Sequence, residues 1–179
     1  MPTNRGAAAM LRTLAKVHDA LTFCSFVAAT VLLGIIFLTY CLEVVLRYLL
    51  NSPTSWSGEL ISYAQCASVF LVMPLLTKVG GHVAITIVID KLPARVAATV
   101  SWFLYFISAV VCLMVAWFGL DENLRQYIDN VRLMRVHAVP QWWISTFITY
   151  GFLMSAIHYL RQLDFRNFSA QYTATSTIG

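Results

Sequence analysis

The chain has 179 residues, of which 59% are hydrophobic and only 11% are charged, and its formal net charge is +4. Soluble domains average about 45–50% apolar and about 25% charged residues, and a domain of about this length leaves roughly a third of its surface in water. An ordinary soluble domain is therefore excluded, because the surplus apolar surface must face lipid. The small and scattered net charge does not indicate a nucleic-acid partner, and we expect none.

Four apolar runs have the length of a membrane crossing. Each is close to the roughly 20 residues that a helix needs to cross a hydrocarbon core of about 30 Å. Helices are expected because an unpaired backbone group in lipid costs several kcal/mol. We predict an all-α membrane protein in which residues 1–166 form a single four-helix membrane domain and residues 167–179 form a polar, disordered tail. The predicted spans are 20–42, 60–79, 96–120 and 138–160.

The flanking charges predict the orientation of these spans. Eight of the twelve lysines and arginines lie in the amino-terminal segment, the second loop and the tail, and four lie in the first and third loops. Because cytoplasmic loops carry the excess of Lys and Arg, both termini are predicted to be cytoplasmic.

Amphipathic segments are predicted on both sides of the first span. Before it, apolar residues recur at helical spacing from Met10 to Leu21, which predicts a helix that lies on the membrane interface or lengthens the span. After it, Glu43 and Arg47 lie four residues apart, the favourable order for a helical ion pair. Two interpretations stay open for this pair. It is either a solvated pair worth about half a kcal/mol or less, or a contact for a partner protein.

The first loop carries the signals of a turn followed by a new helix. Pro53 ends the first helix, and Ser55 or Ser57 can cap the second. Glu59 falls in the first turn, where the helix dipole favours an acid, and Trp56 suits the aromatic belt at the membrane surface.

Further breaks follow along the chain. Pro74 is predicted to kink the second span, and segment 82–95 reads as an interfacial connection in which His82 and Asp90 are the polar landmarks. After the third span, an apolar stripe from Leu124 to Met134 predicts a separate amphipathic helix, and Pro140 is expected near the first position of the fourth span.

What the spans lack limits the function. No Asp, Glu, Lys or Arg lies at the middle of any span, which argues against a self-sufficient ion-coupled exporter. No metal-ligand spacing or nucleophile motif is found, so neither an enzyme nor a cofactor is expected. His18, His82 and His158 fall at the same membrane face, which leaves open a haem-bearing anchor.

The central stretch resembles the small membrane subunit of TRAP transporters, the DctQ-like family. The residues that carry the resemblance are Arg47, Pro53-x-x-Trp56-x-x-Glu59-Leu60, His82 after the second span, and Asp90-x-Leu-Pro93. The family's usual form has an acidic pair after the Trp, whereas this chain has Gly58 in place of the first acid.

The resemblance implies a partner rather than an activity. It implies a large permease subunit that moves substrate with sodium, a periplasmic binding protein that delivers an organic acid, and a location in the bacterial inner membrane among its lipids. The small subunit would act as a fixed scaffold, with Arg47, Pro53, Trp56 and Glu59 shaping the periplasmic corner and His82 and Asp90 the cytoplasmic one. Two alternatives remain at this point: the membrane anchor of a redox enzyme and a small homodimeric exporter.

Overall fold

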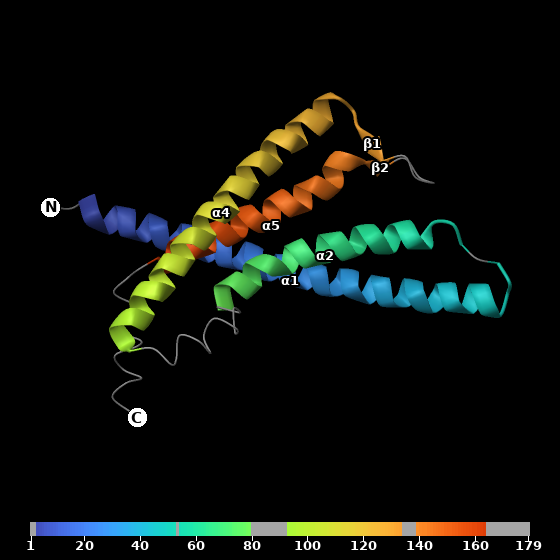
Figure 1. Cartoon of the computed structure of the whole chain (residues 1–179), viewed down its shortest axis with the longest axis horizontal. Helices are drawn as coiled ribbons and strands as arrows, with labels where there is room; N and C mark the ends of the chain where they lie inside the picture. Colours follow the sequence, from blue (N-terminus) through green and yellow to red (C-terminus); the bar gives the residue numbers. More distant parts are fainter. Residues whose placement is uncertain (1–2, 53, 80–92, 134–138, 164–179) are drawn as a thin grey trace.

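The computed structural model describes residues 3–52, 54–79, 93–133 and 139–163, and over these it is helical apart from one small hairpin (Figure 1). The predicted all-α class is thereby confirmed. The elements are α1 (Thr3–Tyr48), α2 (Ser57–Val79), α4 (Ala94–Ile128), β1 (Arg132–Leu133), β2 (Val139–Pro140) and α5 (Gln141–Gln162).

Helix α1 is a single helix of 46 residues. At 1.5 Å per residue it is about 69 Å long, more than twice the hydrocarbon core of about 30 Å. The amphipathic amino-terminal segment therefore lengthens the first span, which decides between the two predicted alternatives. As expected, the helix also continues through Glu43 and Arg47. It ends where Asn51 adopts a left-handed φ of 48° and the Ser52 N–H donates to the Leu46 carbonyl at 3.0 Å.

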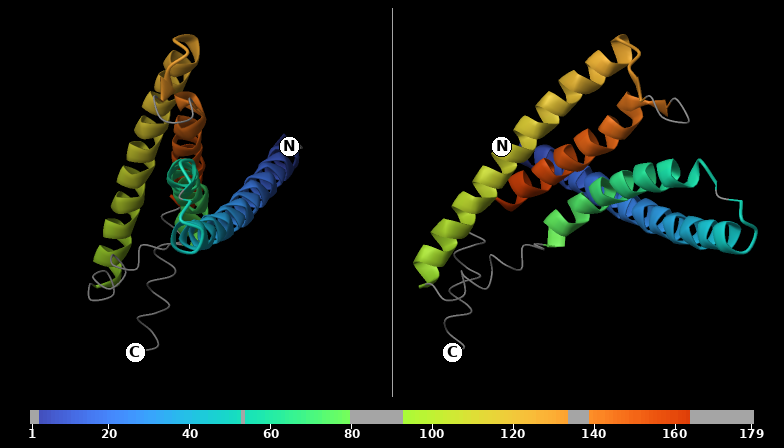
Figure 2. Two further views of the ribbon diagram at one scale, coloured as in Figure 1. Left: turned by 90° about the vertical axis from the view of Figure 1, so that its right-hand side faces the viewer. Right: turned by 45° about the vertical axis from the view of Figure 1, so that its right-hand side comes forward.

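The helices are arranged in the order α1, α2, α5, α4, with each packed against the next. Figure 2 shows the amino-terminal part of α1 leaning away from α4. Helices α2 and α5 each contact two neighbours and therefore lie in the middle of this order.

Three of the four helices are long and apolar enough to be candidate membrane spans: Arg12–Tyr48, Ser57–Val79 and Thr99–Ile128. Helix α5 corresponds to the predicted fourth span but is not among them. Its polar side chains bond to other helices, so they lower its hydropathy without facing lipid. These contacts pair Ser145 with Gln126, Thr149 with Asn123, Tyr150 with Ser25, His158 with Thr22, and Arg161 with Asp19.

Two glycines allow α5 to approach its neighbours at backbone distance. A Cβ on Gly151 would lie 2.6 Å from the Phe70 carbonyl oxygen of α2. A Cβ on Gly119 of α4 would lie 2.6 Å from the Thr149 Oγ1. Small residues at such positions are a common means of packing helices in membranes, where van der Waals contact replaces the hydrophobic effect.

The prediction of a separate amphipathic helix from Leu124 to Met134 is wrong. Helix α4 runs without a break to Ile128 and ends where Asn130 adopts a φ of 51°. The Val131 N–H donates to the Gln126 carbonyl at 3.1 Å, which forms a Schellman-type end with Asn in the position usually held by Gly. β1 then pairs with β2 in antiparallel register. Pro140 is the N-cap of α5, one residue before the first helical position and close to where the sequence predicted it.

Candidate functional site

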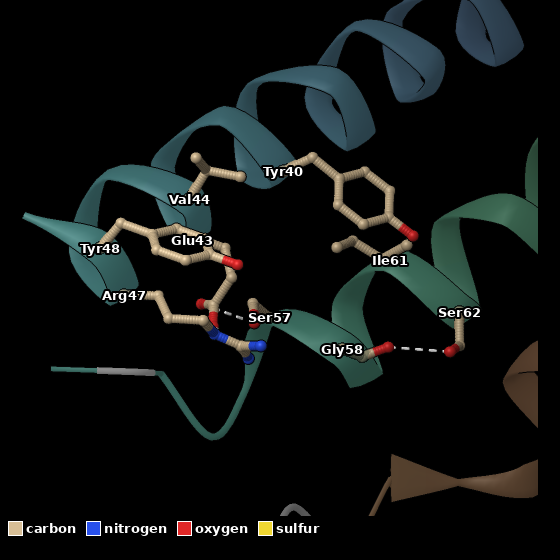
Figure 3. A pocket seen from close by; sticks show the side chains of 9 residues that line it. All are labelled: Tyr40, Glu43, Val44, Arg47, Tyr48, Ser57, Gly58, Ile61 and Ser62. Carbon is tan, nitrogen blue, oxygen red and sulfur yellow. Dashed lines mark hydrogen bonds and ion pairs between the residues drawn. The ribbon is translucent and has the colours of Figure 1, made fainter. Parts of the chain in front are cut away.

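A pocket of about 360 Å³ lies where the carboxyl end of α1 meets the start of α2 (Figure 3). Among the described residues, those that line it come from these two helices: Tyr40, Glu43, Val44, Arg47, Tyr48, Ser57, Gly58, Ile61 and Ser62. We call this region the Glu43 corner. It contains two charged groups, two phenolic rings and several hydroxyls, which together can make directional contacts to a partner.

The Glu43 carboxylate joins the parts of this corner. One oxygen, Oε1, accepts a hydrogen bond from Arg47 Nη2 at 3.0 Å. The other, Oε2, accepts from the Thr54 hydroxyl and, at 3.0 Å, from the Ser57 hydroxyl. Bonds to an ionised acceptor are stronger than neutral ones. A single acid therefore links α1, the turn and α2, and only 12% of its side chain is exposed.

Arg47 faces outward from the same corner. Its side chain is 57% exposed, although one of its nitrogens is bonded to Glu43. A guanidinium carries five N–H donors in a planar fork, so Arg47 can still donate to a carboxylate, a carbonyl or a phosphate that approaches the corner. Figure 3 shows the Tyr40 and Tyr48 rings on the α1 side of the pocket.

The structure brings together only some of the residues that the sequence singled out. Trp56 is exposed at the turn, and Glu59 lies half-buried in the first turn of α2 as predicted, but neither lines the pocket. Of the two possible capping serines, Ser57 is the one that bonds to Glu43. Pro53, His82 and Asp90 lie outside the described residues.

The sequence did not predict that Glu43 joins α1 to the turn and to α2. The i,i+4 spacing pointed only to its pairing with Arg47. The two hydroxyl donors follow it by 11 and 14 residues, across a turn, and no helical periodicity predicts that contact.

A second polar cluster lies around Asp19, within α1, at the carboxyl ends of α2 and α5. Arg161 of α5 donates to it from Nη1 at 2.7 Å and from Nη2 at 3.4 Å. The ammonium nitrogen of Lys78, from α2, lies 3.6 Å from Asp19 Oδ1. Three helices thus converge on one carboxylate.

Two histidines lie beside this cluster, with the ring centroids of His18 and His158 4.1 Å apart. That distance leaves no space for a porphyrin between the rings, so this pair cannot serve as the two axial ligands of a haem in this arrangement. The arrangement of hydrogen bonds assigns a tautomer to His158. The Thr22 hydroxyl donates its one proton to the His18 carbonyl at 2.9 Å, so it accepts from His158 Nε2.

His18, Asp19 and His158 are close enough to be considered as metal ligands, since one candidate ligand atom of each lies within 4.8 Å of the others. The hydrogen bonding of His18 argues against this role. Arg161 Nη1 can only donate, and it lies 3.1 Å from His18 Nδ1, so Nδ1 must accept and the proton must lie on Nε2. Neither ring nitrogen of His18 then has a lone pair free for a metal. The two cations beside Asp19 would also repel one.

Taken together, fold and site define a class: a helical membrane protein whose polar groups join helices and shape a contact surface. The sequence model of the family described as "Tripartite ATP-independent periplasmic transporters, DctQ component" matches residues 36–165. The chain belongs to this family and is a transporter subunit, not an enzyme. The match confirms the resemblance seen in the central stretch and replaces the redox-anchor and exporter alternatives. No curated protein matches the chain.

Family membership also implies the kind of partners, namely the large membrane subunit and the periplasmic binding protein of such transporters. The matched region contains the whole Glu43 corner. His18 and Asp19 precede it, whereas Lys78, His158 and Arg161 lie within it.

Proposed function

We propose that the chain is the fixed scaffold of its transporter and docks the large permease subunit through the Glu43 corner. In this proposal the permease moves an organic acid together with sodium, and a periplasmic binding protein delivers that acid. The chain spans the bacterial inner membrane four times, with both termini cytoplasmic and the Glu43 corner on the periplasmic side. The observation that carries the docking proposal is the exposed Arg47, which is held by one oxygen of Glu43 while Thr54 and Ser57 bind the other.

The spacing of charges along α1 supports this placement in the membrane. Asp19 and Glu43 are 24 residues apart, and the helix between them contains no charged residue. This separation corresponds to about 36 Å, slightly more than the hydrocarbon core of about 30 Å. The two acids therefore bracket one bilayer. The inward polar contacts of α5 likewise support a fourth crossing, because its hydroxyls need no contact with lipid.

The residue types at the corner support its role in docking. Arg and large aromatic residues are enriched among the side chains that contribute most to protein interfaces. Arg47 and Tyr48 line the corner and Trp56 lies beside it at the turn; all three are exposed, on segments that Glu43 joins by hydrogen bonds. A preorganised Arg loses less side-chain freedom on binding than an unrestrained one. In the same proposal, Pro53 and Glu59 shape this corner, and His82 and Asp90 contact the permease on the cytoplasmic side.

Docking can be tested by purifying the tagged subunit with its permease from mild detergent. We expect wild type to retain the permease in stoichiometric amount, and Arg47→Ala and Trp56→Ala to lose most of it. Arg125→Ala is the matched control, because Arg125 is also exposed, forms ion pairs within its own helix and lies on the same proposed side. If Arg47→Ala and Trp56→Ala retain the permease as Arg125→Ala does, the corner is not the docking site. Recovery of the wild-type subunit without any permease would overturn the scaffold role itself.

Topology needs an independent test. Green fluorescent protein folds to its fluorescent form in the cytoplasm, and alkaline phosphatase becomes active in the periplasm. We expect a carboxyl-terminal fusion of the first to fluoresce, and a fusion of the second after Asn130 to be active. An active phosphatase fused after residue 179 would contradict the four-span arrangement with cytoplasmic termini.

A further inference from the structure

The cluster around Asp19 has more positive than negative charge. One carboxylate faces two cations, Lys78 and Arg161, whose side chains are 41% and 37% exposed. The surplus of one positive charge lies at the carboxyl ends of α2 and α5, where the cations reach past the apolar surface into the solvent or headgroup region.

The cluster also has more hydrogen-bond donors than acceptors. Lys78 Nζ is 3.6 Å from Asp19, beyond a direct hydrogen bond, and the second contact of Arg161 is long at 3.4 Å. Lys78 carries three N–H donors and Arg161 five, and Asp19 is the one carboxylate that they face among the described residues. The one carboxylate does not satisfy the donors that surround it.

We propose that this cluster, the Asp19 clamp, binds the phosphate of an anionic phospholipid headgroup in the cytoplasmic leaflet. The phosphate oxygens supply the acceptors that the cluster lacks, and the lipid charge offsets the surplus on Lys78 and Arg161. Basic sites between transmembrane helices on the cytoplasmic side are suited to anionic headgroups.

The surface around the clamp favours a lipid over a free phosphate ion. The helix turns that carry the clamp residues also expose large apolar side chains, and acyl chains can pack against this part of the surface. These side chains are Val17 and Leu21 on α1, Leu76 and Val79 on α2, and Leu160 on α5. A soluble phosphate would use the same donors but would leave this apolar surface uncovered.

The proposal can be tested on the full chain purified in detergent, by native mass spectrometry with added phosphatidylglycerol or phosphatidylcholine. We expect wild type to retain phosphatidylglycerol preferentially, and Lys78→Gln to weaken that retention about fivefold, the share of one cation near an anionic lipid. Arg125→Gln is the matched control, because Arg125 is paired with two acids at the other end of the helices and should leave retention unchanged. Equal retention in Lys78→Gln and Arg125→Gln would overturn the site.

Asp19→Asn distinguishes a lipid site from a cluster that only holds helices together, because the two predict opposite changes in the retention of phosphatidylglycerol. Removing the acid leaves both cations free for phosphate, so we expect retention of phosphatidylglycerol to increase even though the clamp between helices is weakened. Decreased or unchanged retention in this variant would contradict the proposal. If inorganic phosphate displaces the lipid completely at millimolar concentration, the site takes a soluble anion and the lipid assignment is wrong. These outcomes are independent of the docking experiment, which reports on the carboxyl end of α1, 24 residues from Asp19.

Discussion

Two acids on α1 show how one residue type on one helix can take different roles. Glu43 is bound by two neutral hydroxyls and by the single cation Arg47 of its own helix, so its charge is balanced locally. Asp19 is approached by two cations from two other helices, Arg161 and Lys78. The first site has an exposed Arg to offer a partner. The second has an excess of positive charge.

The number of helices that meet at each end accounts for this difference. In the part of the chain that the structure describes, the pocket at Glu43 is lined by α1 and α2, whereas α5 joins them at Asp19. The third helix brings a second cation, and with it the surplus charge. The same α1–α2 pair therefore ends in a balanced corner on one side and in an unbalanced clamp on the other.

The largest loss of stability is expected from Gly151→Ala. This substitution acts on α5, the helix that, among the described residues, is present at Asp19 and absent from the pocket at Glu43. The new Cβ would lie 2.6 Å from the Phe70 carbonyl oxygen, so α5 must move away from α2. Overpacking of this kind costs about 1–3 kcal/mol. We expect a lower temperature of thermal unfolding in detergent. The control is Gly34→Ala, which has no atom within 4 Å of the new Cβ and should unfold no earlier than wild type. Equal stability of both variants would contradict the close approach of α5 to α2.

Asp19→Asn should lower the free energy of unfolding by about 2 kcal/mol in a neutral detergent. This value lies between the cost of breaking an exposed ion pair and that of breaking a buried one. The reason is the repulsion between Lys78 and Arg161 once the acid is gone. Thermal unfolding measures this loss, and adding Lys78→Gln should recover part of it by removing one of the two cations. If the stability lost in the double variant equals the sum of the losses in the two single variants, Lys78 and Arg161 do not repel each other once Asp19 is removed.

Glu43→Gln should have a smaller and more local effect, because the amide oxygen of Gln can still accept from Thr54 and Ser57. The charge that strengthens these bonds is lost, and so is the bond from Arg47, because the amide nitrogen that replaces the second oxygen cannot accept. We expect faster hydrogen exchange at the turn between Tyr48 and Ser57, measured by mass spectrometry, and unchanged exchange around Asp19. Protection lost equally at both ends would show that the two sites are coupled and not separate.

Arg47→Gln should have the smallest effect on stability, below about 0.5 kcal/mol, because exposed helical ion pairs contribute little. Its effect on retention of the permease should nevertheless be large if the Glu43 corner is the docking site. Measuring unfolding and permease retention on the same preparation separates the two roles. A large loss of stability would show that Arg47 supports the fold itself, and a retention defect would then be indirect.

Much of the fold could be predicted from the sequence. The all-helical class, the continuation of α1 through Arg47, the place of Glu59 in the first turn of α2 and the family were predicted correctly. The helix predicted to reach Met134 was wrong, because periodicity does not reveal that Asn130 adopts a left-handed conformation. Four crossings with cytoplasmic termini, and the roles of Arg47, Pro53, Trp56, Glu59, His82 and Asp90, remain predictions.

What the sequence by itself determined is local. The lengths of apolar runs, helical periodicity and turn residues each depend on neighbours a few positions away, and the short motif around Trp56 was enough to indicate the family. The tertiary structure alone decided which polar side chains meet. Arg161 contacts Asp19 although the two residues are 142 positions apart in the sequence. The polar side chains of α5 make its hydropathy too low for a candidate span, and only the packing of the helices shows that they bond to other helices. The physical reason is that a hydrogen bond or an ion pair depends on distance in space, and packing of whole helices sets that distance.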